Sequence, residues 1–357
     1  MRLWFLLAVV LVAGCVGQPT VGPNPPPEDN TTPPVQPVSN PFIFDIVYTG
    51  FSDVHLQEIR NSGVTNLTLF ICWSQIEPEN GTFDWTIPDQ RIERYSELGM
   101  PPAGAVVDWW EGCHPSWLDG INETDDVYIS KLSQAAEAAA ARYGQKIKYW
   151  MVGNELNGQY WHGRYDPKVV VLQKSVSAAV RRGWPEAQVG TRLAFDGWDE
   201  NVANWAPFLD EIKDNSDWVG IQVYPVGAGF HPGDHALRQA VELAINRSGG
   251  KPVWVTETGV QLCQCEQLGA TGNDYHHCMD GSESCSLWVD ESRQQLWMRE
   301  LIHDAWDAGA IGVSVYRWGD PYYSLIDEVA YFEENYTFKP KPVLVTLRET
   351  YHELQAP

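Results

Sequence analysis

Basic residues are scarce in this chain of 357 residues, which has 24 lysines and arginines against 47 aspartates and glutamates and a formal net charge of −23. A surface with this excess of negative charge repels phosphate groups, so the composition argues against nucleic acid and anionic lipid surfaces as partners. Hydrophobic residues make up 44% and charged residues 20% of the sequence, which is typical of a soluble globular protein with a sizeable core.

Two common cofactor motifs are also missing. No glycine-rich turn of the dinucleotide-binding type follows a predicted strand, which argues against an open, doubly wound sheet. No paired CxxC motifs of the kind that hold structural zinc occur either. We therefore expect no cofactor and no metal.

The N-terminal apolar run, residues 3–14, is too short for a typical membrane span. It leads directly into Ala13, Gly14 and Cys15, and this LVAGC stretch resembles a lipobox, the signal at which a prolipoprotein is cut and its cysteine lipidated. The resemblance implies a signal peptide over residues 1–14 and a lipid anchor on Cys15. An ordinary cleaved secretion signal is the alternative.

The segment 15–40 is rich in proline and polar residues and cannot bury a core. We interpret it as an extended, disordered tether, followed by one folded domain over residues 41–357. The protein is then expected at the outer face of a cell membrane, held there by its lipid, or else secreted. We expect it to be a monomer.

Export to an oxidising compartment favours disulfides among the other six cysteines. Cys72 and Cys113 follow neighbouring predicted strands and are candidates for one pair. Four more lie within residues 263–285, where two cross-links would stiffen a long loop. A metal site with His276 and His277 is the competing interpretation, and the pairing itself stays open. The six residues are Cys72, Cys113, Cys263, Cys265, Cys278 and Cys285.

Apolar runs with strand character alternate with segments that have helical periodicity. The predicted strands are 42–50, 65–73, 101–109, 147–155, 187–196, 218–225, 252–259 and 311–320. The predicted helices are 52–63, 88–99, 125–144, 167–183 and 291–309. Continuous apolar strands joined by helical crossovers indicate a parallel sheet that is covered on both faces. Eight such units predict an α/β fold, a single (β/α)8 barrel.

Polar and aromatic side chains gather at the carboxyl ends of these predicted strands, where function is located in a (β/α)8 barrel. A single acid at such a position is more often a helix cap or an ion-pair partner, but so many together are hard to explain as caps. The residues are Trp73, Asp108, Trp109, Trp110, Asn154, Glu155, Tyr224, Glu257, Arg317, Trp318 and Asp320.

Two carboxyl groups that face each other across a polar cleft are what cleavage of a glycosidic bond requires. One protonates the leaving oxygen, and the other attacks or stabilises the oxocarbenium centre. Indole rings supply flat apolar faces for sugar rings, and the chain has 17 tryptophans. Six of them lie in or beside strand-end loops: Trp73, Trp109, Trp110, Trp117, Trp161 and Trp318. Of these six we take Trp73, Trp109, Trp161 and Trp318 as candidates for sugar binding.

The motifs GNE (153–155) and TETG (256–259) resemble clan A of the glycoside hydrolases, which are retaining (β/α)8-barrel enzymes. By that resemblance Glu155 is the acid/base at the end of strand four. Glu257 is then the nucleophile at the end of strand seven.

The same resemblance gives roles to three further residues. Asn154 is expected to hold the sugar 2-hydroxyl, and Tyr224 to orient the nucleophile. Trp318 is expected to form the floor of the subsite for the reacting sugar.

Within the clan, WSQIEPENGTFDW (73–85) and HPSWL (114–118) resemble segments of family 10 enzymes, and families 39, 42 and 5 are similar. Two departures follow. On strand two, many members have a basic residue before the tryptophan, whereas this chain has Phe70, Ile71 and Cys72 there. On strand three, residues around Asp108 replace the usual histidine. We expect Asp108, Trp109 and His114 to shape a sugar pocket of this protein's own.

The sequence thus predicts a retaining glycoside hydrolase that cleaves β-glycosidic bonds of a polysaccharide or oligosaccharide. An endo-β-glycanase of the cellulase or xylanase type is preferred, with residues 261–290 as one wall of the cleft. The alternatives are an exo-acting β-glycosidase on short glycans and a non-catalytic carbohydrate-binding barrel. A metal-dependent hydrolase is disfavoured, because His114 and His162 are the only histidines near the strand ends.

Overall fold

The computed structural model describes residues 42–48, 52–109, 112–158, 167–195, 205–225, 231–260, 291–316 and 342–355. The strands in these residues are β1 (Ile43–Ile46), β2 (Leu67–Cys72), β3 (Pro102–Asp108), β4 (Tyr149–Asn154), β5 (Gln188–Ala194), β6 (Trp218–Val223), β7 (Val253–Thr258) and β8 (Gly312–Val315). The α-helices are α1 (Asp53–Asn61), α2 (Trp73–Ile76), α3 (Thr86–Glu97), α4 (Asp126–Tyr143), α5 (Pro167–Gly183), α6 (Trp205–Ile212), α7 (Ala236–Arg247), α8 (Glu291–Asp307) and α9 (Pro342–Gln355). Short 3₁₀ turns lie at η1 (Ser116–Leu118) and η3 (Lys213–Asn215).

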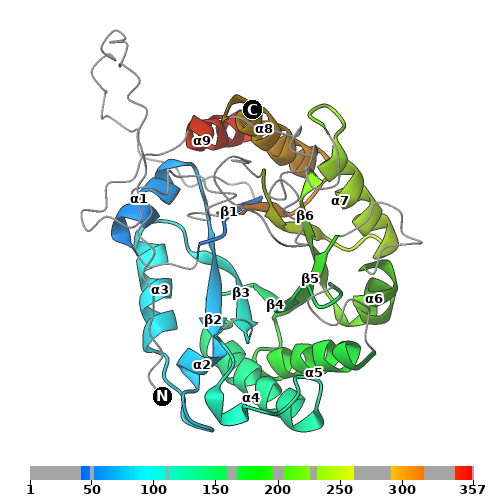
Figure 1. The fold of residues 1–357 in the computed structure, drawn as a ribbon. Helices are drawn as coiled ribbons and strands as arrows, with labels where there is room; N and C mark the ends of the chain where they lie inside the picture. Colours follow the sequence, from blue (N-terminus) through cyan, green and yellow to red (C-terminus); the bar gives the residue numbers. More distant parts are fainter. Residues whose placement is uncertain are drawn as a thin grey trace, which may run out of the picture. The chain divides into compact units, whose positions relative to one another are not determined.

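The eight strands form one parallel sheet in the order β1-β8-β7-β6-β5-β4-β3-β2. At the two ends of this order, hydrogen bonds join β1 to β2 and to the residues just before β2. The amide of Thr65 donates to the carbonyl oxygen of Phe44 at 2.9 Å, and the Thr68 hydroxyl donates to the Asp45 carboxylate at 2.7 Å. The strands form an inner ring and the helices an outer one (Figure 1). This confirms the predicted (β/α)8 barrel.

All five predicted helices form, as α1, α3, α4, α5 and α8, and each predicted strand contains one observed strand. The observed strands are shorter than the predicted ranges, by two residues at the start of β2 and of β4. Helix α5 matches its predicted range, and α3 begins and ends two residues earlier than predicted. The helices α2, α6, α7 and α9 were not predicted. Among the described residues, no helix has both the length and the apolar stretch needed to span a bilayer.

Two indole rings, those of Trp218 and Trp254, pack inside the barrel with their centroids 5.6 Å apart. Glycines on β5 and β3 make room for them. A Cβ atom at Gly190 would lie 2.4 Å from the ring of Trp218, and one at Gly104 would lie 3.0 Å from that of Trp254. Both indole N–H groups also find acceptors, a backbone carbonyl at 2.9 Å and a serine hydroxyl at 3.1 Å. The interior is therefore a packed core rather than a channel.

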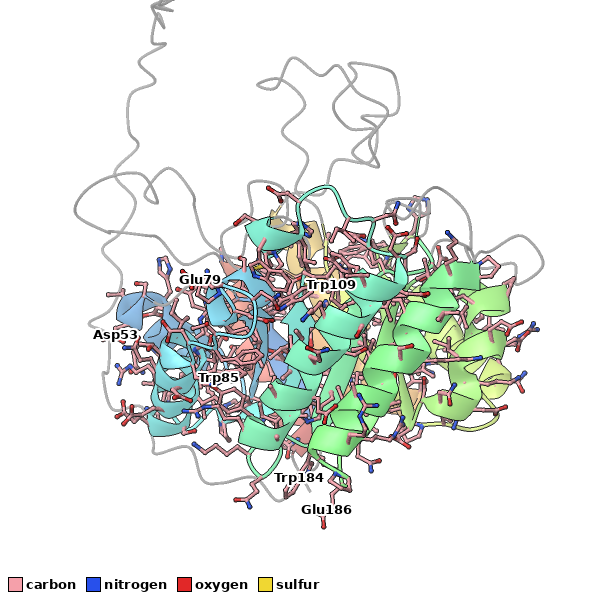
Figure 2. The ribbon with its side chains drawn as sticks, turned by 90° about the horizontal axis from the view of Figure 1, so that it is seen from below. Asp53, Glu79, Trp85, Trp109, Trp184 and Glu186 are labelled. Carbon is pink, nitrogen blue, oxygen red and sulfur yellow. A yellow bond between two sulfur atoms is a disulfide. The ribbon has the colours of Figure 1, made fainter. Side chains whose placement is uncertain are left out.

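The two ends of the barrel can be told apart by the loops that they carry. Glu79 and Trp109 follow β2 and β3, whereas Trp184 and Glu186 lie between α5 and β5. Figure 2 shows Trp109 towards one end of the barrel, and Trp184 and Glu186 at the opposite end. The candidate site lies at the end that carries Trp109, because it is built from the carboxyl ends of the strands.

Candidate active site

Glu257, near the end of β7, is held by two donors from two other strands. The Tyr224 hydroxyl donates to Oε2 at 2.9 Å, and the Arg192 guanidinium forms an ion pair with Oε1. The Glu257 side chain is only 11% exposed. An ionised carboxylate, which is purely an acceptor, satisfies both donors at once. The contact with Tyr224 is the one that the sequence predicts.

A shift in strand register explains why Glu257 reaches these donors. Trp254 faces the barrel interior, and strict alternation along β7 would turn residue 257 towards the helices. The register of β7 against β6 shifts between Ile221 and Gln222, and against β8 it shifts between Val255 and Thr258. Such a bulge inserts one residue and changes the face on which the next side chain lies.

Arg192 of β5 binds the carboxylate of Glu257 and the backbone of Glu155. Its side chain pairs with Glu257, while its backbone carbonyl accepts the amide N–H of Glu155 at 3.0 Å. The guanidinium carbon lies 5.8 Å from the centroid of the Phe70 ring on β2. The Arg192 side chain is 3% exposed, and its Nε has no hydrogen-bond partner among the described residues. A charge buried this deeply depends on its carboxylate partner.

Glu155 directly follows β4 and has a strained backbone. Its φ angle is 49°, in the left-handed region that residues other than glycine rarely adopt. The preceding Gly153 also has a positive φ of 73°, and a Cβ atom there would lie 2.6 Å from Leu156. The Glu155 carbonyl accepts the amide of Gly158 at 2.7 Å, which closes the turn. Strain of this kind is concentrated at functional positions, where the surrounding bonds hold it in place.

Asn154, the last residue of β4, is oriented by a side chain that the sequence analysis did not identify. The amide nitrogen of Gln222 on β6 donates to its Oδ1 at 2.6 Å. This bond fixes the direction of the Asn154 amide group. Its contact with a substrate hydroxyl stays a prediction.

Arg192 is the other residue that sequence reasoning missed. Its signal was present, since an arginine inside the apolar strand 187–196 needs a buried acid as partner. Arg192 of β5 supplies the positive charge that strand two lacks. Phe70 of β2 packs against the guanidinium, and the positive charge comes from β5.

The expectation that Trp73 offers a face to a sugar ring is wrong. This side chain is fully buried, with the rings of Trp117 and Tyr128 edge-on to it at 5.8 and 5.4 Å. Its indole N–H donates to the Glu77 carboxylate at 2.7 Å, and the same carboxylate accepts the amide of Gly81 at 2.7 Å. Trp73 is therefore a core residue at the start of α2 and offers no face to a sugar ring.

Trp109 is likewise buried, with 3% exposed, and offers no open face, so its prediction as a sugar platform is also wrong. His114 is engaged within the protein. Its Nδ1 lies 3.1 Å from the Tyr128 hydroxyl and its Nε2 lies 3.5 Å from the Asp119 carboxylate. Asp108 ends β3, is partly buried and is paired in register with Cys72. Substrate contacts of Asp108 and His114 stay predictions.

The remaining predicted positions lie outside the described residues. These are Trp161, Trp318, the lipidation candidate Cys15 and the four cysteines of 263–285.

A disulfide joins Cys72, the last residue of β2, to Cys113 in the loop after β3. It confirms the pairing for which these residues were candidates. Ser74 adds two bonds to the same loop, from its amide to the carbonyl of Cys113 and from its hydroxyl to that of Gly112, both at 2.8 Å. The loop that carries Trp109 and His114 is thus fastened to β2.

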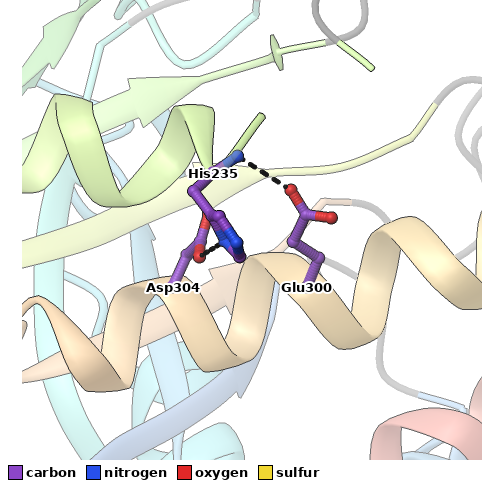
Figure 3. Close-up of side chains that lie close together, drawn as sticks. All are labelled: His235, Glu300 and Asp304. Carbon is purple, nitrogen blue, oxygen red and sulfur yellow. Dashed lines mark hydrogen bonds and ion pairs between the residues drawn. The ribbon is translucent and has the colours of Figure 1, made fainter. Parts of the chain in front are cut away.

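Among the described residues, one group offers three potential metal ligands: His235, Glu300 and Asp304, with ligand atoms within 4.8 Å of one another (Figure 3). These atoms already have partners. Glu300 accepts the amides of Gly233 and His235 at 2.6 and 3.1 Å, and Asp304 accepts the amide of Arg238 at 3.3 Å. The Arg238 side chain lies 3.6 Å from Asp304, where it would repel a cation.

The group is better explained as a cap on helix α7. His235 precedes α7 and has a φ of 52°, and the two carboxylates on α8 accept N–H groups at or just before the helix start. Burial raises the pKa of Asp304, and hydrogen bonds from His235 and Arg238 act against that rise. The cluster joins α7 to α8. Within the described part of the chain, none of the hydrogen bonds of its three residues involves Glu155 or Glu257.

No protein-family model matches the chain. Its fold is similar to that of several solved glycoside hydrolases. The exo-β-1,4-mannosidase of Opitutaceae bacterium strain TAV5 has a TM-score of 0.62 at 16% identity, over 88% of this chain and 60% of that one. The GH5_18 enzyme of Streptomyces cattleya, solved with GlcNAc, has a TM-score of 0.64 at 14% identity, over 90% and 82%.

A family 39 glycoside hydrolase from the gut symbiont Bacteroides cellulosilyticus WH2 has a TM-score of 0.60 at 19% identity, over 87% of this chain and 64% of that one. The chain thus spans about 60% of the mannosidase and somewhat more of the family 39 enzyme. Identities this low establish the common (β/α)8 fold, and the chemistry of the site has to be argued from its own residues.

Proposed function

We propose that the protein is a retaining β-glycosidase with Glu257 as nucleophile and Glu155 as acid/base. The observation that carries the proposal is the way the Glu257 carboxylate is held, by the Arg192 guanidinium at Oε1 and by the Tyr224 hydroxyl at Oε2. Glu155 directly follows β4, where its backbone amide donates to the Arg192 carbonyl of β5. Two acids at the carboxyl ends of β4 and β7 in a (β/α)8 barrel match the two roles that glycoside hydrolysis requires.

In the first step Glu257 attacks the anomeric carbon while Glu155 protonates the leaving oxygen. A covalent glycosyl-enzyme forms, and the negative charge of Glu257 disappears. In the second step Glu155 removes a proton from water, which releases the sugar with retained configuration. Retention requires the two carboxyl groups to be about 5–5.5 Å apart.

Tyr224 and Arg192 have distinct parts in this scheme. They hold the Glu257 carboxylate at two different oxygens, so its attack does not have to begin from a freely rotating side chain. Arg192 also stabilises the charge that returns to Glu257 when the covalent bond breaks. The two residues therefore act on the Glu257 carboxylate both before the covalent intermediate forms and when it breaks down.

The finer proposal is endo action on a β-linked polysaccharide at the cell surface. It is supported by the LVAGC sequence at Cys15, which resembles a lipidation signal, because a tethered enzyme meets polymers too large to enter the cell. Cys15→Ser expressed in a bacterial host should move from the detergent phase to the aqueous phase on detergent partitioning. A parent protein found in the aqueous phase would overturn the anchor but not the glycosidase.

The function is tested by product release from soluble β-glucan, xylan, mannan, galactan and chitosan. The parent should release reducing sugar from at least one of them, and Glu257→Gln should release none. Glu349→Gln, the same change at an exposed position on α9, is the matched control and should retain parent activity. Glu155→Ala should still react with activated aryl β-glycosides, whose leaving groups need little protonation.

Product length separates the modes of action. A ladder of oligosaccharides indicates endo cleavage, and a single mono- or disaccharide indicates exo cleavage. Equal activity of parent and Glu257→Gln would refute the assignment of the nucleophile.

A further inference from the structure

A buried asparagine follows the candidate acid/base by two residues. Asn157 is completely buried. Its Nδ2 donates to the carbonyl oxygen of Ala194 on β5 at 2.8 Å, and its Oδ1 accepts the amide N–H of the same residue at 3.0 Å. Because one of these backbone groups is an acceptor and the other a donor, the pair fixes which end of the Asn157 amide is which.

The end of β5 depends on this side chain for its hydrogen bonds towards β4. The amide of Phe195 donates to Gln222 of β6 at 2.9 Å, whereas the carbonyl of Arg192 accepts the amide of Glu155 on the other side. Ala194 lies between them, and its amide and carbonyl face the β4 side. The strand β4 ends at residue 154, so the Asn157 side chain takes the place of strand backbone there.

The same bonds fasten the turn that contains the strained residue. The amide of Glu155 is bonded to Arg192, and the side chain of Asn157 is bonded to Ala194, two residues further along β5. Between these two attachments the chain passes through the left-handed φ of 49° at Glu155. A non-glycine residue stays in this region only while its surroundings hold it there. A change in this φ would rotate the Cα–Cβ bond of Glu155 and redirect its carboxyl group.

We propose that Asn157 is a positioning residue for Glu155, and this inference rests on the proposed function. Its two hydrogen bonds to Ala194 hold the turn in the conformation that directs the acid/base. The nucleophile is held separately, through the Glu257 contacts with Arg192 and Tyr224. Loss of the Asn157 amide therefore weakens proton donation to the leaving group and spares nucleophilic attack.

The leaving group of the substrate separates these two effects. A 2,4-dinitrophenyl β-glycoside loses its aglycone without protonation, whereas a phenyl β-glycoside needs the general acid. Both are made with the sugar that the parent releases from glycans, and kcat/KM is measured, because it reports the steps up to the covalent intermediate. Asn157→Ala should lower kcat/KM for the phenyl glycoside at least about tenfold more than for the dinitrophenyl glycoside. An equal loss on both substrates would overturn the proposal.

The matched control is Asn66→Ala. The Asn66 Nδ2 donates to the carbonyl oxygen of Pro101 at 2.9 Å, just before β2 and β3, at the other end of the barrel. Its loss also removes an amide from a backbone carbonyl, and the ratio of the two kcat/KM values should stay at the parent ratio. A fall in that ratio as large as in Asn157→Ala would show a general effect of stability and refute the specific role.

A second variant covers the case in which Asn157→Ala does not fold. Asn157→Asp keeps the shape of the side chain and an acceptor for the Ala194 amide, but the ionised carboxylate cannot donate to the Ala194 carbonyl. The phenyl glycoside should again lose more than the dinitrophenyl glycoside. An unchanged ratio in this variant would then overturn the proposal.

Hydrogen exchange tests the turn without any substrate. In Asn157→Ala the amides of Glu155 and Gly158 should exchange at least about tenfold faster than in the parent, because the turn opens locally. They should exchange at the parent rate in Asn66→Ala. Unchanged exchange of both amides in Asn157→Ala would show that Asn157 does not hold the turn.

Failure of this role and failure of the glycosidase proposal give different results. A parent that cleaves glycosides, with equal losses on both substrates in Asn157→Ala, refutes the role of Asn157 alone. Faster exchange of the two amides in a protein that cleaves no glycoside establishes that Asn157 holds the turn and refutes the enzyme.

Discussion

At the scale of single residues, the site depends on how Glu257 is held. Tyr224 and Arg192 bind opposite oxygens of one carboxylate, so losing either leaves that carboxylate with one fixed bond. The role of Tyr224 was predicted from the resemblance to clan A of the glycoside hydrolases. Arg192 was not, because an arginine within a strand does not reveal which acid it faces across the barrel.

Removing only the hydroxyl of Tyr224 tests this arrangement. Tyr224→Phe should lower kcat/KM on an aryl β-glycoside by about 10²-fold, the range found when one preorganised donor is lost. Tyr149→Phe, the same deletion at the amino end of β4, should keep the parent value. An equal effect of both substitutions would mean that Tyr224 acts only through folding.

The pH dependence of stability follows from Asp45. Burial holds the pKa of Asp45 near 7 in the folded protein, above its ordinary 3.8, so the folded state keeps a proton that the unfolded chain has lost. The stability contribution is therefore fully present below pH 4 and is lost as the pH rises to 7.

Over that range the loss attributable to this group is on the order of 4 kcal/mol, at about 1.4 kcal/mol per pH unit. Asp45→Asn removes the effect, so its stability relative to the parent should increase between pH 4 and pH 7. Urea midpoints across this range measure it. A difference independent of pH would contradict the assignment.

At the scale of elements, the alternation of apolar strands with helices was enough to predict the barrel, because strand spacing and helix periodicity are local signals. The helices α2, α6, α7 and α9 were missed. α6 has only eight residues, and the start of α7 is capped by Glu300 and Asp304, more than sixty residues away. The bulge that turns Glu257 depends on pairing between strands, which periodicity does not encode.

Close approach between strands gives a prediction about β5. Gly190→Ala should destabilise the protein by about 1–3 kcal/mol, because its Cβ atom would lie 2.4 Å from the ring of Trp218. Combining it with Trp218→Phe should cost less than the sum of the two single changes, since the smaller ring returns the space. Thermal unfolding of the three variants measures this, and strict additivity would argue against the contact.

At the scale of the whole molecule, one described cross-link reinforces the barrel between β2 and the loop after β3. Such a bridge acts mainly by restricting the unfolded chain. The sequence offered this pair as a candidate because both cysteines follow neighbouring strands. The tryptophans Trp73 and Trp109 could not be assigned in the same way, since an indole at a strand end fits equally in the core and in a cleft.

The double variant Cys72→Ser/Cys113→Ser should lose roughly 3–4 kcal/mol of unfolding free energy, as expected for a closed loop of several tens of residues. Denaturation of the parent in reductant should approach the same value. If reductant does not change the unfolding free energy of the parent, and the double variant is as stable as the parent, the bridge contributes nothing to stability.

The most direct test of the central claim is to trap the covalent intermediate. The protein is incubated with activated 2-deoxy-2-fluoro β-glycosides of glucose, mannose, galactose and xylose, digested, and mapped by mass spectrometry. The account predicts one added sugar on the peptide that contains Glu257, with no label in Glu257→Gln and normal label in Glu349→Gln. Glycan cleavage by the parent with the label on another residue would contradict it.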